Sequence, residues 1–371
     1  MADAQISVAV LGAAGTIAPA IVHDLARSEE VARMALLDLD PGKAGAVAEE
    51  HGAGKASASG IDARDVEALA SAIRDADAQV LLNTASYRIN LEAMRACLEA
   101  GCHYLDLGGL YRMTLRQLEL TAEFERAGRL AVLGIGSSPG KTNLMAAEAV
   151  RRLGGTGAGG IDSIDVFAAG RDAGAPADGR LRPPYAIQTL IDELTLEPIV
   201  LRDGKPEQIA PLSDGGTVDY GEPIGEGETI YTLHSELATF GESFGCRRAS
   251  FRLSLAPALL ARLEELAEAP AEEVAAAARE AASPSNQTVS VHLVKVAGTD
   301  GSALTARAIT RPHFGLGGSV ISTATPAAAC VRLFARGALT ATGVHPPERC
   351  IEPGLMFAEL EARGCTFSFE S

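Results

Sequence analysis

A glycine-containing turn near the start of the chain could hold the phosphates of a dinucleotide. It follows the apolar stretch Ile6–Leu11 and has glycines at Gly12 and Gly15 and a small residue at Ala18. Gly12 permits a tight turn, Gly15 lets the backbone approach a pyrophosphate, and Ala18 keeps the next helix close to the strand. The N–H groups and the dipole of that helix would bind the phosphates. The spacing GxxGxxA differs from GxGxxG, so the turn alone is only moderately specific.

An acidic residue follows the second apolar stretch of the chain. Asp38 lies 20 residues after Ala18, where a carboxylate could accept hydrogen bonds from the adenosine ribose hydroxyls. Because a carboxylate there repels a 2′-phosphate and the next basic residue is only Lys43, we predict NAD as the cofactor rather than NADP. The alternative is that Asp38 merely caps the helix that starts at Pro41.

Polar residues also follow two further strand-like stretches. Asp62 comes after 56–60, where it could approach the adenine or N-cap the next helix. The sequence Asn83-Thr84-Ala85 ends the stretch 79–82, at the edge of a parallel sheet where cofactors bind. The predicted cofactor-binding residues are therefore Gly12, Ala14, Gly15, Thr16, Ile17, Asp38, Asp62, Asn83, Thr84 and Ala85.

The segment 136–142 looks like a Walker A loop but misses its spacing. The pattern GxxxxGK[ST] through Gly140 and Lys141 requires glycine at position 135, which is Ile135. We therefore reject an ATPase. Ser138 could N-cap a helix with Pro139 at its first position, and this helix N-terminus together with Lys141 would form an anion site.

The elements that must position these residues alternate regularly over the first 150 residues. Each of six strand-like stretches is followed by a helical pattern, and the stretches are 6–11, 35–37, 56–60, 79–82, 103–107 and 130–135. Such alternation requires parallel strands joined by right-handed crossovers. We predict an α/β fold with a doubly wound parallel Rossmann sheet.

The pattern changes after residues 154–160, five of which are glycine. These glycines predict a surface loop or a hinge between domains. Beyond them, strand-like pieces with turns such as Asp203-Gly204, and helices at 185–194 and 256–282, predict an α+β domain on a mostly antiparallel sheet. The predicted domains are 1–153 for dinucleotide binding, 154–310 for substrate binding and dimerisation, and 311–371 as a C-terminal segment.

Composition and charge exclude several classes of protein. The chain has 371 residues and a net charge of −16, so nucleic acids and anionic membrane surfaces are not expected partners. The N-terminus has no basic region before an apolar stretch, and the apolar segment 320–335 contains Pro326 and Arg332. We therefore expect no signal peptide, no membrane helix and a cytoplasmic location. The six cysteines form no CxxC pair, which predicts reduced thiols and no metal site.

Further motifs are shared with a known family. They are the strand end Asn83-Thr84-Ala85, the helix end Leu98-Glu99-Ala100-Gly101, the sequence Tyr104-Leu105-Asp106, Pro139-Gly140 with Asn143, and the stretches 232–236 and 343–348. The chain resembles the saccharopine dehydrogenase family in these segments. Asp106-Leu107-Gly108-Gly109 with Gln117-Leu118 looks most like the L-lysine 6-dehydrogenase branch.

The resemblance implies an NAD-dependent oxidoreductase that interconverts an amine C–N bond and an imine on a basic amino acid. Saccharopine and carboxynorspermidine-type dehydrogenases are the alternatives within the family. The resemblance also implies that the middle domain is an insertion, that residues after about 311 return to pack on the nucleotide domain, and that the protein forms a homodimer or larger oligomer.

Oxidation of an amine needs a base for the ammonium proton and a cation for the substrate carboxylate. For the cation we predict Arg247, then Lys141 and Arg171, since arginine binds carboxylates through two hydrogen bonds. A solvated Arg247-Arg248 pair is the alternative.

For the base we predict His234 or Asp106, because histidine titrates near the working pH and Asp106 ends a strand at the cofactor edge. Glu236 could bind the substrate amine, and Tyr185 and Tyr111 are weaker candidates. Each of these residues also has a structural alternative. His234 could be a core histidine, Asp106 could lie in a turn or cap a helix, and Glu236 could be a surface residue. The predicted catalytic residues are thus Asp106, His234, Arg247, Lys141 and Glu236.

A protein that binds NAD as a sensor or scaffold, without turnover, is the alternative from another class. The glycine turn would persist in such a protein. The grouping of His234, Glu236 and Arg247 in the sequence argues against it, and substrate-dependent formation of NADH would separate the two.

Overall fold

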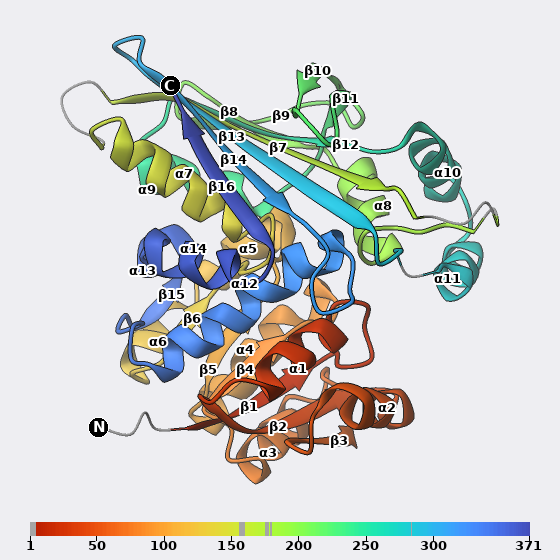
Figure 1. Ribbon diagram of the computed structural model, residues 1–371. Coiled ribbons are helices and arrows are strands. Elements are labelled where there is room, and N and C mark those ends of the chain that lie inside the picture. The colour runs from red at the N-terminus through yellow and green to blue at the C-terminus, as the bar shows by residue number, and fades with distance from the viewer. Residues whose placement is uncertain (1–4, 156–159, 175–177, 179, 283) are drawn as a thin grey trace. The chain divides into compact units, whose positions relative to one another are not determined.

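The computed structural model of the chain describes residues 5–155, 160–174, 178, 180–282 and 284–371 (Figure 1). Its contacts divide the chain into two compact units. Unit 1 comprises Met1–Lys141 and Thr323–Glu359, and unit 2 comprises Thr142–Ser322 and Leu360–Ser371. The division after Lys141 comes earlier than the sequence-based boundary at residue 153. Of the glycine-rich segment predicted as a loop or hinge, residues 156–159 lie outside the described residues.

Unit 1 contains a seven-stranded sheet in the order β15-β6-β5-β4-β1-β2-β3, with every neighbouring pair parallel. The strands are β1 (Ile6–Leu11), β2 (Val31–Asp38), β3 (Ala56–Gly60), β4 (Val80–Asn83), β5 (His103–Asp106), β6 (Leu130–Val132) and β15 (Gly343–His345). The predicted doubly wound sheet is confirmed. Its seventh strand was not predicted, because three residues far along the chain carry no strand pattern of their own.

The helices of unit 1 pack around this sheet (Figure 1). They are α1 (Ala18–Ala26), α2 (Pro41–His51), α3 (Val66–Asp75), the 3-10 turn η1 (Tyr87–Ile89), α4 (Asn90–Ala100), α5 (Leu110–Leu118) and α6 (Thr121–Arg126). The helical pattern expected between the strand-like stretches 103–107 and 130–135 forms two helices, α5 and α6. The chain turns between them where the Thr121 hydroxyl donates to the Leu118 carbonyl oxygen at 2.6 Å, a local hydrogen bond that competes with helix continuation.

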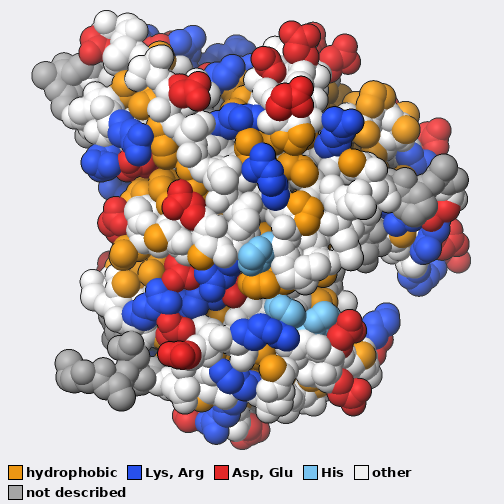
Figure 2. Space-filling view, viewed as in Figure 1, with side chains coloured by type: hydrophobic (Ala, Val, Ile, Leu, Met, Phe, Trp, Pro, Cys, Tyr) orange, Lys and Arg blue, Asp and Glu red, His pale blue; other side chains and the backbone are white. Residues whose placement is uncertain are grey.

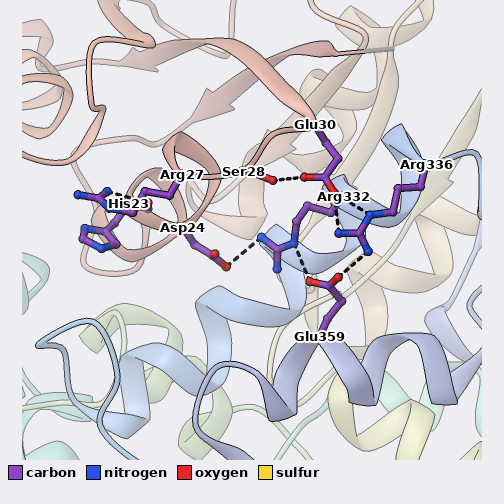
Figure 3. Close-up of polar contacts among 8 residues, drawn as sticks. All are labelled: His23, Asp24, Arg27, Ser28, Glu30, Arg332, Arg336 and Glu359. Atoms are coloured by element: carbon purple, nitrogen blue, oxygen red, sulfur yellow. Dashed lines mark hydrogen bonds and ion pairs between the residues drawn. The ribbon is translucent and has the colours of Figure 1, made fainter. Parts of the chain in front are cut away.

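The C-terminal part of the chain is bound to unit 1 by ion pairs of α12 (Gly318–Ala335) and α14 (Pro353–Glu361). Arg332 of α12 is 1% exposed and pairs with Asp24 of α1 at 3.1 Å and with Glu359 of α14 at 2.7 Å. Arg336 pairs with Glu359 and with Glu30, each at 2.6 Å. Figure 3 shows the Glu359 carboxylate lying between the two guanidinium groups. This network holds α12 against the first helix of the nucleotide-binding sheet. Between α12 and α14 lie β15 and the short helix α13 (Pro347–Cys350).

Unit 2 is built on a nine-stranded mixed sheet. Its main path is β10-β11-β12-β7-β13-β14-β16, and β8 pairs with β12 and with β9. The strands are β7 (Ile161–Asp172), β8 (Ile199–Arg202), β9 (Lys205–Gln208), β10 (Asp214–Asp219), β11 (Glu226–Tyr231), β12 (Arg248–Ser254), β13 (Thr288–Gly298), β14 (Ala303–Thr310) and β16 (Cys365–Glu370). Only the β7–β12 pair is parallel, so the prediction of a mostly antiparallel sheet is confirmed.

The helices of unit 2 are α7 (Lys141–Arg152), α8 (Ile187–Thr195), η2 (Ser235–Ala238), α9 (Phe240–Phe244), α10 (Pro257–Ala267) and α11 (Ala271–Glu280). The long helix predicted over 256–282 is broken at Pro270, since proline cannot continue a helix that precedes it. The predicted start of α7 at Pro139 was wrong. The Ser138-Pro139 peptide is cis, the Pro139 carbonyl accepts a hydrogen bond from the Gly136 N–H at 2.9 Å, and the helix begins only at Lys141.

The surface carries acid and base intermixed, as the visible face in Figure 2 shows. Acidic side chains gather over β10 and β11, where Asp214, Asp219, Glu226 and Glu228 are exposed (Figure 2). The six cysteines are free thiols. Over the described ranges, no helix is both long and apolar enough to cross a membrane, and no three His, Cys, Asp or Glu side chains are grouped to hold a metal ion.

Candidate functional sites

The turn after β1 is packed tightly against the end of β4. Gly12 has a φ of +79°, and a Cβ on it would lie 2.5 Å from the Ala85 nitrogen, so no larger residue fits. The Thr84 hydroxyl donates to the carbonyl oxygens of Leu11 at 2.8 Å and Gly12 at 3.1 Å. Ala85 N–H donates to the Asn83 side chain at 3.0 Å. Four of the predicted residues thus hold the shape of the turn.

Helix α1 begins at this turn with its N-terminal N–H groups lacking a side-chain cap. Its N-cap residue is Ile17, which has no side-chain oxygen, and its first turn carries no acidic residue. Gly15 and Thr16, directly before it, are exposed. An uncapped helix end beside exposed small residues fits the pyrophosphate of a dinucleotide, because the helix supplies N–H donors and a partial positive charge.

Asp38 ends β2 beside this turn. One of its carboxylate oxygens accepts from the Ala14 N–H at 2.9 Å and the other from the Asp40 N–H at 2.9 Å. The alternative reading, in which Asp38 caps the Pro41 helix, was wrong, because Asp40 is the N-cap and accepts from the Lys43 N–H at 3.0 Å. The carboxylate of Asp38 is thus bound to the turn that follows β1, and its contact with a ribose stays a prediction.

Asp62 is engaged locally with Arg64. The Arg64 side chain donates to both carboxylate oxygens, at 2.6–3.1 Å. These hydrogen bonds, with that of the Arg64 backbone, lower the pKa of Asp62 to about 2. The predicted N-cap role of Asp62 was wrong, since Asp65 caps α3 by accepting from the Ala68 N–H at 3.0 Å. The approach of Asp62 to an adenine stays a prediction.

The carboxylate of Asp106 is the centre of a buried network at the end of β5. Asp106 is 1% exposed, and its burial raises its pKa although four of its hydrogen bonds act in the opposite direction. Five donors surround the carboxylate, namely the N–H groups of Gly108 and Gly134 and the side chains of Tyr104, Gln117 and Asn90, at 2.6–3.2 Å. A carboxylate with about four lone-pair positions is saturated by these donors, an arrangement that suits a fixed acceptor better than a base.

A second buried network lies in unit 2, at the start of η2. His234 is 5% exposed and Glu236 is 0% exposed. The His234 Nδ1 is paired with one Glu236 oxygen in a short hydrogen bond, and the Thr142 hydroxyl donates to the other oxygen at 2.9 Å. The imidazole stacks on Phe251 with ring centroids 3.6 Å apart and an interplanar angle of 15°. The ring is therefore fixed on one face and at one nitrogen.

A further carboxylate of this network, Glu193 of α8, was missed by sequence reasoning. Glu193 is 3% exposed and accepts from the Tyr185 hydroxyl at 2.5 Å. Burial, with the charge of Glu236, raises the pKa of Glu193 to about 7 against the opposing effects of His234 and Tyr185. The sequence offered one signal for Glu193: it is an acidic residue close to the apolar residues Leu190 and Leu194 of the same helical segment.

The negative charges of Glu236 and Glu193 also change the pKa of His234. Burial lowers the pKa of His234, but Glu236 and Glu193 raise it by more, so the net direction is upward. The network thus combines an imidazole, two carboxyls and a phenol in one buried place, and the pKa of one of the carboxyls, Glu193, is about 7. Perturbed groups that face one another are typical of sites that move protons.

The predicted cations have different surroundings. The Arg247 side chain is 61% exposed and pairs with Asp203 at 3.0 Å, which is the solvated arrangement that the sequence left as the alternative. Arg171 donates to the Pro223 carbonyl oxygen at 3.0 Å. Lys141 is 1% exposed.

Comparison with known proteins finds similarity to one family of enzymes. Residues 8–132 match the family model of the saccharopine dehydrogenase NADP-binding domain. A carboxyaminopropylagmatine dehydrogenase from Synechocystis sp. is 26% identical over 267 residues, which cover 70% of this chain and 65% of that protein. A carboxynorspermidine synthase from Vibrio alginolyticus is 29% identical over 123 residues, 30% of this chain and 29% of that protein. The matched part is therefore less than two thirds of the length of either relative.

The fold has a counterpart among solved structures. The apo form of a saccharopine dehydrogenase (L-Glu forming) from Saccharomyces cerevisiae superposes with a TM-score of 0.71 at 14% identity, covering 99% of this chain and 100% of that one. At this identity the match concerns the fold alone. Together with the domain match over 8–132 and the two relatives, this fold makes the chain similar to the saccharopine dehydrogenase family.

Proposed function

We propose that this chain is an NAD(P)-dependent oxidoreductase that interconverts an amine C–N bond and an imine on a small substrate that carries both an amine and a carboxylate. The observation that carries the proposal is the buried His234–Glu236–Glu193 network, because amine oxidation needs a group that accepts the ammonium proton. The nucleotide turn of unit 1 and the names of the two curated relatives support the same reaction type.

The nicotinamide nucleotide, when bound, supplies the hydride acceptor or donor. In this chain the N–H groups at the start of α1 would hold its pyrophosphate, and Gly12 would keep the turn close to Thr84 and Ala85. Asp38 would accept hydrogen bonds from the adenosine ribose. Since a carboxylate disfavours a 2′-phosphate, we propose NAD ahead of NADP, although the matched domain is described as NADP-binding.

His234 is our choice as the base. Only the neutral amine gives up hydride easily, so the substrate ammonium must first lose a proton, which a neutral imidazole can accept. The Glu236 carboxylate holds Nδ1 and would stabilise the imidazolium that forms. For each turnover of the oxidation, one ammonium and the oxidised cofactor become one iminium, the reduced cofactor and one proton, which His234 receives. In the reverse direction, the imidazolium returns this proton.

The substrate class follows from the relatives and the resemblance together. Both curated relatives have names that denote carboxylated polyamines, so we propose a carboxylated polyamine ahead of L-lysine, the substrate of the branch that the sequence resembles. Saccharopine is a further alternative of the same reaction type. Buried carboxyls of unit 2 suit a cationic amine in each case.

The test is an assay of NADH or NADPH formation by the purified protein. The panel contains carboxynorspermidine, carboxyaminopropylagmatine, L-lysine and saccharopine, each with NAD and with NADP at alkaline pH. Turnover of a carboxylated polyamine supports the proposal, and turnover of L-lysine alone moves the chain to the lysine branch. If no amine is turned over while NAD still binds, the result favours the alternative hypothesis of an NAD-binding sensor or scaffold without turnover.

A further inference from the structure

The His234 imidazole belongs to a network with two carboxyls that differ in their bonding. Glu236 is bonded directly to Nδ1 and is held at its other oxygen by Thr142. Glu193 comes from another element, α8, and its side chain is bonded to the Tyr185 hydroxyl at 2.5 Å. Glu236 thus fixes the imidazole ring. Glu193 makes its hydrogen bond to Tyr185 instead, so its role must be a different one.

Glu193 is tied to the histidine segment through the backbone. Its carbonyl oxygen accepts from the N–H of Leu233 at 3.4 Å, the residue directly before His234. This hydrogen bond joins α8 to the segment before η2, so the residues that carry the two side chains lie close together in the fold. Both side chains are buried from water, so the charge of one acts on the other with little screening.

We propose that Glu193, oriented by Tyr185, is a positioning residue that sets the proton affinity of His234. An ionised carboxylate near the ring favours the imidazolium, whereas a protonated carboxyl leaves the ring with Glu236 alone. The protonation of Glu193 therefore decides at which pH the histidine becomes the neutral base. This role deepens the proposed function. The titration of His234 tests it without assuming that function, whereas the kinetic test rests on the proposed function.

The charges that face Glu193 come from several elements. Tyr185 precedes α8, Asp192 is on α8 itself, and His234 and Glu236 flank the start of η2; each of these four influences the ionisation of Glu193. Burial and the charge of Glu236 raise its pKa to about 7, and the charges of Glu236 and Glu193 in turn raise the pKa of His234. Glu193 therefore exchanges its proton near pH 7, and the imidazole of His234 binds its proton more tightly than a free histidine does.

The experiment is a titration of His234 by NMR in the full-length protein labelled at histidine. A spectrum of His234→Asn identifies the His234 signal among the seven histidines. In Glu193→Gln the side chain keeps its shape and loses its charge, so the midpoint of His234 should fall by about one pH unit. Glu197→Gln, which neutralises an exposed carboxylate just beyond α8, is the matched control and should leave the midpoint unchanged.

Tyr185→Phe is the second variant and guards against misfolding of Glu193→Gln. Removing the hydroxyl takes a donor from the Glu193 carboxylate, keeps Glu193 protonated to higher pH and should lower the His234 midpoint in the same direction by a smaller amount. A folded Glu193→Gln or Tyr185→Phe protein whose His234 titrates at the wild-type midpoint, or at a higher one, overturns the proposal.

Turnover gives an independent readout. The acid limb of the pH profile of kcat/KM should move to lower pH in Glu193→Gln by the same amount as the NMR midpoint, because the neutral base forms earlier. An acid limb that stays in place while the midpoint moves would show that His234 is not the base, which refutes the proposed mechanism and leaves the role of Glu193 intact. Absence of any amine turnover refutes the proposed function alone.

Discussion

Asp38 is the residue on which the choice of cofactor rests. Its carboxylate ends β2, accepts from the Ala14 N–H in the phosphate turn and would meet the ribose hydroxyl that distinguishes NAD from NADP. In Asp38→Ser the repulsion of a 2′-phosphate is lost, so the ratio of kcat/KM for NAD over NADP should fall about tenfold or more. The measurement is steady-state kinetics with both cofactors.

Asp40→Ser is the matched control for this change. Asp40 caps α2, and serine is also a good N-cap, so the selectivity ratio should stay at its wild-type value. Equal ratios in wild type and Asp38→Ser would remove Asp38 from the cofactor site.

His234 is the residue on which the chemistry rests. Asparagine keeps a polar side chain near Glu236 but cannot accept a proton at neutral pH, so His234→Asn should reduce kcat/KM for the amine by about 10²–10⁴-fold. Cofactor binding, followed by fluorescence of NADH, should be unchanged. His313→Asn, on a loop of the same unit, should retain full activity. A His234→Asn enzyme with wild-type kcat/KM would leave the base to be sought elsewhere.

At the level of elements, the attachment of α12 depends on one buried arginine. Arg332 neutralises Asp24 of α1 and Glu359 of α14, and removing a single member of a buried ion network leaves charges uncompensated. We expect Arg332→Met to lower the free energy of unfolding by about 3–5 kcal/mol, measured by urea denaturation followed by circular dichroism.

An exposed ion pair in the same unit provides the comparison. Arg33 and Asp77 are paired at 3.0 Å with side chains 57% and 78% exposed, so Arg33→Met should cost less than about 1 kcal/mol. Similar losses for both variants would mean that the buried network contributes no more than a surface pair.

At the level of the whole molecule, Glu193 makes folding stability depend on pH. Its pKa is about 7 in the folded chain, against 4.5 for an ordinary glutamate, so between these values the folded state binds more protons than the unfolded state. Stability should therefore fall as the pH rises from about 4.5 to 7, by roughly 3 kcal/mol for this one group. Denaturation of Glu193→Gln across this range should show a flatter profile than wild type.

A second carboxyl acts in the opposite direction at lower pH. Burial favours the neutral form of Glu30, but its hydrogen bonds to Ser28, its own backbone and Arg336 outweigh this and lower its pKa to about 2. The stability that Glu30 contributes is complete above pH 4.5 and is lost as the pH falls toward 2.

The pH dependence of the two proteins tests the assignment of Glu193. It would be contradicted if the wild-type protein became more stable from pH 5 to 7 and Glu193→Gln showed the same dependence of stability on pH.

What the sequence alone determined is mostly local. All six N-terminal strands formed where strand-like stretches predicted them. Five of these stretches are short apolar runs, which a strand buried on both faces needs, whereas Ala56–Gly60 is mostly exposed. The position of the phosphate turn could be predicted because it requires small residues in a fixed order. Helices broken inside one polar or alanine-rich stretch, at Leu120 and Pro270, were harder to predict, since either half would continue the same periodic pattern.

Tertiary structure decided which polar residues meet. Asp38 and Asp62 had the same cap alternative in the sequence, and the caps proved to be Asp40 and Asp65, two and three residues later, because only the backbone geometry selects the oxygen that reaches the helix N–H groups. Glu193 and His234 are 41 residues apart in the chain and share a network only through the packing of α8 against the segment before η2. Contacts between residues that lie far apart in the chain depend on how helices and strands pack together. The local pattern of a single sequence does not predict them.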